Sequence, residues 1–450
     1  MIIIILFIIL LNKLFIFSLN KNKYICRIIN KAKTMKKLIL TMLLVNLIVY
    51  GQKKDDFLSN FEAKAYGVVN YYNFDWDSDK SKRNEFDTER LNFYLKYNFS
   101  DKIQLKTEIE FEHGGTGVTM ELDKFEEFGE FETEVEAGGE VKLEQINILF
   151  NYKPWLNLRV GRVKLYMGNA SKLDLPTEYF TGYRSAMENA LLPMGWYENG
   201  IELLGDFGKN NRWSYKAFFV NGLSSEAFSS ANWIKRGHQQ RFETILVENF
   251  AISARLDYNL KNDGFIGVSA YRGNTNGNRQ KNDLKNTDGN LSIIDAHANL
   301  DLKDFKLRVM FLYGNLQNAD KISSANRNLP NALDVKRTPV AKNAMGYYAE
   351  AAYNIMPLLI KKPSGTQKLF VFGRYDFYDS MYKTTGDITD NPRWERSVFT
   401  TGLNYHITKD ITFKTHYAVN SLGADTLDGY NNVIGNKERT FLLGMGFKID

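Results

Sequence analysis

The feature that most constrains this chain is an alternation of apolar and polar residues with a period of two. It begins near residue 62 and recurs to the end of the sequence. In one clear segment Leu91 and Phe93 share one face, while Arg90 and Asn92 share the other. Such alternation predicts β-strands with one apolar and one polar face, and we find no convincing stretch with the 3.6-residue period of an amphipathic helix.

Sixteen segments carry this pattern, and each is close to the length that a tilted membrane-spanning strand needs. Short connections with turn residues, such as FSDK at 99–102 and YKPW at 152–155, alternate with much longer loops. The predicted strands are 62–74, 86–99, 102–113, 141–152, 156–165, 197–207, 212–222, 250–260, 263–273, 291–302, 304–315, 344–356, 367–379, 394–407, 410–421 and 438–449.

An even number of strands with alternating short and long connections is typical of a transmembrane barrel. In hydrocarbon no backbone group can bond to water, so the sheet must close and leave no edge. We therefore predict an all-β fold, a transmembrane antiparallel β-barrel of about 16 strands with short periplasmic turns and long extracellular loops, formed by residues 52–450. A soluble β-sandwich, whose strands also alternate, is the alternative.

The N-terminal residues resemble a targeting segment rather than part of the folded domain. From Met35 two lysines precede a short apolar core that ends before Gly51, which is the order of a secretory signal peptide over 35–51. A membrane anchor is the alternative interpretation of this core. Residues 1–34 use few residue types, and we interpret them as a mis-set start or a leader extension. Export and a membrane barrel together predict a location in the cell outer membrane.

Charge and cysteine content exclude several classes of function. Eight of the 58 basic residues and none of the 52 acidic ones precede residue 52, so the rest of the chain is nearly neutral and we expect no nucleic-acid partner. The one cysteine, Cys26, lies in the predicted leader. His406 and His416 lie on neighbouring predicted strands, but no metal-ligand spacing or serine motif accompanies them. We predict no metal site, no cofactor and no enzymatic activity.

Residues 156–223 contain the sharpest motifs of the chain. The sequence reads LNLRVGRVKLYMGNAS, then YRSAMENALLPMGWYENGIELLGDF, then WSYKAFFVNGL. This stretch resembles the phosphate-selective porin O/P family of outer-membrane porins. The resemblance implies a sixteen-stranded trimeric channel whose third long loop, 166–196, folds into the lumen and forms the constriction.

A pore selects anions by lining its narrowest part with basic side chains. Acidic residues such as Glu108, Glu202 and Asp257 share the inward face with the basic ones, and the second long loop, 114–140, is strongly acidic. We therefore predict a passive channel for small hydrophilic solutes or ions, with anions such as phosphate as one option and the ion preference left open. The predicted pore-lining residues are Arg90, Lys96, Arg159, Lys172, Arg184, Arg255, Arg308, Arg374 and Arg396.

Two other functions remain open. A barrel enzyme of the lipase type would need a catalytic serine near His406 or His416, and a structural or adhesive barrel would have a closed lumen. For the channel we expect outer-membrane lipid and small solutes as partners and a homotrimer as the assembly. We further expect Arg159 and Lys172 to face the permeation path.

Overall fold

The computed structural model describes residues 58–115, 119–127, 130–136, 139–239, 245–262, 264–329, 337–360, 366–427 and 433–450. Residues Glu62–Asp450 form a compact unit, which is a β-barrel. The predicted leader extension at 1–34 and signal peptide at 35–51 lie outside the described residues. Both therefore stay predictions.

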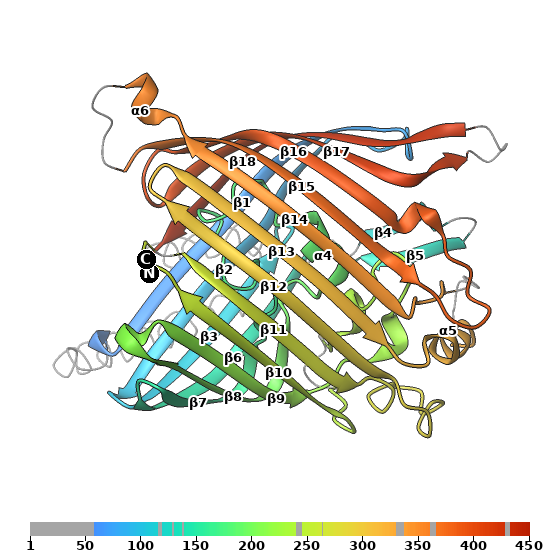
Figure 1. Ribbon diagram of the computed structural model, residues 1–450, viewed down its shortest axis with the longest axis horizontal. Coiled ribbons are helices and arrows are strands. Elements are labelled where there is room, and N and C mark those ends of the chain that lie inside the picture. The colour runs from blue at the N-terminus through green and yellow to red at the C-terminus, as the bar shows by residue number, and fades with distance from the viewer. Residues whose placement is uncertain are drawn as a thin grey trace, which may run out of the picture. The chain divides into compact units, whose positions relative to one another are not determined.

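Sixteen strands form one closed antiparallel barrel, in which β1 completes the circle against β18 (Figure 1). All sixteen predicted segments are strands of this barrel, so the predicted fold class is confirmed. The strands are β1 (Phe61–Trp76), β2 (Glu85–Ser100), β3 (Ile103–Glu112), β6 (Glu140–Lys153), β7 (Leu156–Lys164), β8 (Tyr197–Phe207), β9 (Trp213–Asn221), β10 (Phe250–Asn259), β11 (Phe265–Asn274), β12 (Asn290–Leu302), β13 (Phe305–Leu316), β14 (Asn343–Asn354), β15 (Lys368–Lys383), β16 (Glu395–His406), β17 (Ile411–Leu427) and β18 (Val433–Ile449).

Many residues on the outside of the barrel are apolar, and many of those on the inside are polar or charged. In β10 Phe250 and Ile252 are 51% and 58% exposed, whereas Arg255 and Asp257 are 3% and 4% exposed. A soluble β-sandwich would bury its apolar face, so this arrangement excludes that alternative. An exposed apolar face on a closed sheet requires lipid around it, which places the barrel in the outer membrane as predicted.

Several strands are longer than the alternation predicted. β15 continues to Lys383, β17 continues to Leu427, and β18 already begins at Val433. The predicted loop at 114–140 also contains a separate two-stranded sheet of β4 (Thr119–Glu127) and β5 (Glu130–Glu136). Strand segments that project beyond the bilayer meet water on both faces and need no apolar face. The alternation of apolar and polar residues is therefore weaker there.

The described helices are short and lie in the connections: α4 (Ala186–Leu191), α5 (Ala319–Arg327) and α6 (Met356–Leu359). None of the helices in the described part of the chain is long and apolar enough to cross a membrane. Figure 1 shows α6 at the barrel end that carries the C-terminus, and α5 and the β4–β5 sheet at the opposite end. The short connections lie at the same end of the barrel as the C-terminus, and this end is therefore the periplasmic one.

Part of the barrel interior is filled by an apolar core. Leu165, Met187 and Leu191 from the segment after β7 are at most 1% exposed, as are Phe228 and Trp233 from the connection after β9. They belong to one cluster with inward-facing apolar residues of β7 and of every strand from β9 to β17. The loops therefore fill part of the lumen by ordinary hydrophobic packing.

Candidate channel lumen

The segment 165–196 lies inside the barrel. It follows β7, yet the side-chain amide of Asn169 donates to the backbone carbonyl of Val309 in β13 at 3.0 Å. On another wall, the side-chain amide of Asn404 in β16 donates to the carbonyl of Phe180 at 3.0 Å. Because β13 and β16 are many strands away from β7 around the barrel, the segment must cross the lumen to make these bonds. Its predicted role as the constriction stays a prediction.

Three cations converge on Asp174 in this loop. Its carboxylate accepts from Arg90 in β2 at 3.1 Å and from Nε of Arg184 at 2.9 Å, and it also pairs with Lys164 at the end of β7. Burial alone would raise the pKa of Asp174, but the three cations, Arg184 foremost, hold this pKa well below its usual range. Asp174 is therefore ionised at neutral pH and joins both halves of the loop to the wall.

A second group of charges holds the loop on the far wall. Asp376 in β15 accepts from the hydroxyl of Ser185, the N-cap of α4, at 2.9 Å and from Arg374 at 2.8 Å. Glu350 in β14 accepts from Arg308 at 3.0 Å and from Arg374 at 3.5 Å. These carboxylates and guanidinium groups are buried, and each is compensated by an opposite charge, as buried ions require.

A third group surrounds Asp257 in β10. Its carboxylate accepts from Lys172 of the loop at 3.0 Å and from Arg255 at 3.0 Å, and one oxygen lies 2.9 Å from Nε2 of His297. The other ring nitrogen of His297 lies 2.5 Å from Asp295. Arg255 also donates to a backbone carbonyl of the loop at 2.5 Å. The loop is thus fastened to three different parts of the wall.

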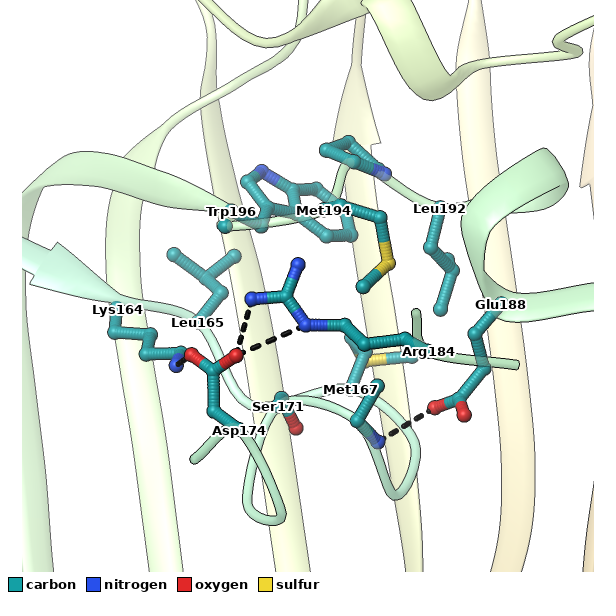
Figure 2. Close-up of a pocket in the computed structure, with 13 residues that line it drawn as sticks. Lys164, Leu165, Met167, Ser171, Asp174, Arg184, Glu188, Leu192, Met194 and Trp196 are labelled. Atoms are coloured by element: carbon teal, nitrogen blue, oxygen red, sulfur yellow. Dashed lines mark hydrogen bonds and ion pairs between the residues drawn. The ribbon is translucent and has the colours of Figure 1, made fainter. Parts of the chain in front are cut away.

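The two limbs of the loop leave little room between them. Figure 2 shows Met167 and Ser171 on one limb and Arg184 and Glu188 on the other, around a cavity of about 20 Å³. Glu188 accepts from the backbone N–H of Ala170 at 2.8 Å, and burial raises the pKa of Glu188 to about 7. A space of this size holds about one water molecule.

A larger cavity, which we call the vestibule, lies between the loop and the wall of β1, β2, β3 and β18. Its volume is about 330 Å³. Lys96 bonds to Glu62 at 3.0 Å, whereas Lys106 lies 5.0 Å from the centre of the Tyr94 ring. The charged residues that line the vestibule are Lys64, Lys96, Lys106, Lys448, Glu62 and Asp450.

The structure places the nine predicted pore-lining residues in ion pairs or ring contacts. Arg90, Arg255, Arg308 and Arg374 are at most 5% exposed. Lys96 and Lys172 keep 33% of their side chains exposed. Their partners are Asp174 for Arg90 and Arg184, Glu62 for Lys96, Glu202 for Arg159, Asp257 for Lys172 and Arg255, Glu350 for Arg308, Asp376 for Arg374, and the ring of Trp394 for Arg396. Whether a solute meets them stays a prediction.

Lys64 and Lys448 also line the vestibule, and they are not among the predicted pore-lining residues. Lys448 lies opposite Tyr66 in the register of β18 and β1, and Tyr66 is buried inside the barrel. Lys64 lies two positions before Tyr66 and therefore on the same face. The period of two, followed to the ends of the first and last strands, would have identified both lysines.

The histidines do not form the sites that were considered for them. His406 faces Thr412 in the register and His416 faces Gly402, so the two rings are not direct cross-strand neighbours. Neither ring nitrogen of His416 has a hydrogen-bond partner among the described residues, which does not fit a serine–histidine pair. In the described part of the chain no group of three or more His, Cys, Asp or Glu side chains is placed to hold a metal ion.

Comparison with known proteins gives distant likenesses. No family model matches the chain. An uncharacterized protein of Aquifex aeolicus is 27% identical over 357 residues, which cover 78% of this chain and 74% of that protein.

Among solved structures, the chain is similar to OmpT, an outer membrane protein of Vibrio cholerae, with 8% identity, a TM-score of 0.46 and coverage of 86% of this chain and 99% of that one. The anion-selective porin from Comamonas acidovorans is 11% identical, with a TM-score of 0.47 and coverage of 86% of this chain and 100% of that one. The outer membrane channel DcaP of Acinetobacter baumannii is 10% identical, with a TM-score of 0.48 and coverage of 87% of this chain and 98% of that one. The assignment of the fold rests on the strand pairing described above.

Proposed function

We propose that the protein is a passive channel of the outer membrane, through which small hydrophilic solutes or ions diffuse. The observation that carries this proposal is the vestibule, a cavity of about 330 Å³ lined by charged side chains inside a lipid-facing barrel. A polar, hydrated interior within an apolar outer surface is the arrangement that a diffusion channel needs.

The route in this proposal runs beside the loop rather than through it. The space between the limbs of the loop has a volume of about 20 Å³, whereas the vestibule has a volume of about 330 Å³. The vestibule lies between Leu175 of the loop and the wall formed by β1, β2, β3 and β18. The loop 166–196 would then act as the constriction by narrowing the lumen against this wall. The ion pairs of Asp174 and Asp257 support a loop that keeps this position during transport.

A finer part of the proposal is a preference for anions such as phosphate. Four lysines but two carboxylates line the vestibule, and an excess of positive charge at close range attracts anions. The resemblance of residues 156–223 to the phosphate-selective porin O/P family supports the same preference. It also supports a homotrimer, which chemical crosslinking of the protein in membranes would test.

Recording from single molecules in planar bilayers tests the proposal. We expect steady ohmic current steps from the wild type and a reversal potential of the anionic sign under a salt gradient. Lys96→Gln combined with Lys106→Gln should move this potential towards cations, whereas Lys303→Gln, in an exposed turn at the same end, should not. An unmoved potential would refute the vestibule route.

Charge reversal of Arg159 and Lys172 tests the earlier prediction that both face the path. An unchanged reversal potential in that double variant would show that they act only as partners of Glu202 and Asp257.

A closed structural barrel is the second candidate. The apolar cluster that includes Leu165, Met187 and Trp233 fills part of the lumen, which favours a blocked interior. The two candidates differ in conductance. Folded protein that inserts into the bilayer and carries no current would support the closed barrel and reject the channel.

A further inference from the structure

The connection between β14 and β15 differs from the other periplasmic turns. Those between β2 and β3, β6 and β7, and β12 and β13 each need two residues, whereas this one spans 355–367. Its first described part, Ile355–Ile360 in sequence, contains only apolar residues and includes α6. Three of them are strongly exposed: Leu358 at 73%, Leu359 at 63% and Ile360 at 47%.

The start of α6 is fixed by Asn354. The side-chain oxygen of Asn354 accepts from the backbone N–H groups of Met356 at 3.2 Å and Leu369 at 3.1 Å. Its side-chain nitrogen donates to Asp304 in the neighbouring turn at 3.1 Å. Met356 is 4% exposed and so faces the protein. Leu358, two positions after Met356, projects from the opposite side of this single helical turn. Leu359, three positions after Met356, lies on the same side of the turn as Met356 but beyond it, and it remains exposed.

The exposed residues of α6 continue the lipid-facing surface of the barrel. Tyr353, three positions before α6, is 46% exposed on the outside of β14. In the register it lies between Phe305 of β13 and Val371 of β15, which are 37% and 40% exposed. The backbone N–H of Ile355 still bonds to the carbonyl of Leu369 at 2.8 Å, so the sheet leads into α6 without a gap.

We propose that Leu358, Leu359 and Ile360 form a lipid anchor, which inserts into the periplasmic leaflet of the outer membrane beside the end of β14. An apolar turn that continues a lipid-facing surface gains from entering the boundary between headgroups and acyl chains, where its apolar side chains leave water. The other described periplasmic turns, with residues such as Asp101, Lys102 and Lys303, have no comparable apolar run.

Site-directed fluorescence tests this proposal without reference to transport. In a Cys26→Ser background, Leu359→Cys carries an environment-sensitive fluorophore, and the protein is reconstituted into vesicles of phosphatidylethanolamine and phosphatidylglycerol. The matched control is Lys303→Cys in the adjacent turn, where the native side chain is 92% exposed. Leu358→Cys serves as a second probe if the first variant does not fold.

We expect a blue-shifted emission for the α6 probes, strong quenching by spin-labelled lipid and little quenching by aqueous iodide. The control should show the reverse. Quenching of the α6 probes by iodide alone would overturn the proposal, because the turn would then lie in water. Protection from both quenchers would overturn it as well, because a second copy or another protein would then cover these residues.

Discussion

Asp174 shows how a charged residue can be structural in the lumen of this barrel. It is 8% exposed, and it is contacted by Arg90, Lys164 and Arg184, which come from three separate parts of the sequence. A buried charge is tolerated when opposite charges and hydrogen bonds replace the water that it has lost. Removing one member of such a group leaves the others buried and unpaired.

Asp174→Asn should therefore destabilise the folded barrel by about 3–5 kcal/mol, because three cations lose their counter-charge. The fraction of folded protein after heating in detergent, read from the shifted gel band of the unfolded form, measures this effect. Asp206→Asn at the exposed periplasmic end of β8 is the control and should leave the transition in place. Equal stability of the two variants would mean that the loop does not depend on Asp174.

Glu188 predicts a pH dependence of the opposite sign to that of Asp174. Burial raises its pKa from about 4.5 to about 7, so the folded state favours the protonated form. The contribution of Glu188 to stability is therefore complete below about pH 4.5 and is lost as the pH rises through about 7.

Glu188→Gln keeps an acceptor for Ala170 but cannot ionise. We expect the wild type to lose on the order of 2–3 kcal/mol more stability than the variant between pH 4.5 and pH 8. Urea unfolding in phospholipid vesicles at several pH values measures the difference. The exposed Glu248→Gln should follow the wild type, and parallel curves for Glu188→Gln would contradict the prediction.

At the scale of elements, two glycines shape the wall next to the loop. Gly161 in β7 and Gly200 in β8 lie opposite each other in the register and have φ values of 131° and 157°. A Cβ on Gly161 would lie 2.4 Å from the carbonyl oxygen of Ile146, and one on Gly200 would lie 2.2 Å from that of Phe219. The two glycines thus mark positions where neighbouring backbones approach closely.

Gly200→Ala should strongly reduce the yield of folded barrel, because the added methyl group meets backbone and the φ value strains any side chain. Refolding yield in detergent is the measurement. Gly373→Ala in β15 is a matched control, since a Cβ there has no heavy atom within 4 Å. Similar yields for both variants would show that the wall can relax around Gly200.

At the scale of the whole molecule, the barrel exposes many large apolar side chains on its outer face, whereas a soluble protein buries most of them. Phe311 in β13 is 43% exposed and lies between Ala296 of β12 and Tyr347 of β14, near the middle of the wall. The outward side chains can stay apolar only because lipid covers them, and the closed sheet leaves no backbone group unpaired there.

Phe311→Arg should cost about 2–4 kcal/mol, because it places a charge near the centre of the bilayer, whereas Leu302→Arg near the periplasmic interface should cost about 0–1 kcal/mol. Unfolding of both variants in phospholipid vesicles measures the costs. Equal costs would mean that Phe311 does not face hydrocarbon.

The sequence by itself determined the sixteen barrel strands and their faces, because the part of each strand that spans the bilayer meets lipid on one side and the barrel interior on the other. It did not determine where β15, β17 and β18 end, because their projecting parts meet water on both faces. Phe250 and Arg255 could be assigned to outside and inside from their positions alone. The same rule, applied at the chain ends, would have found Lys64 and Lys448.

Only the tertiary structure decided which inward charges pair and where room remains for a solute. The contacts of Arg90 with Asp174, and of Ser185 with Asp376, join residues that are far apart in sequence. They depend on the path of the loop 165–196 across the lumen. That path follows from packing against several strands at once, and no local period in the sequence records it.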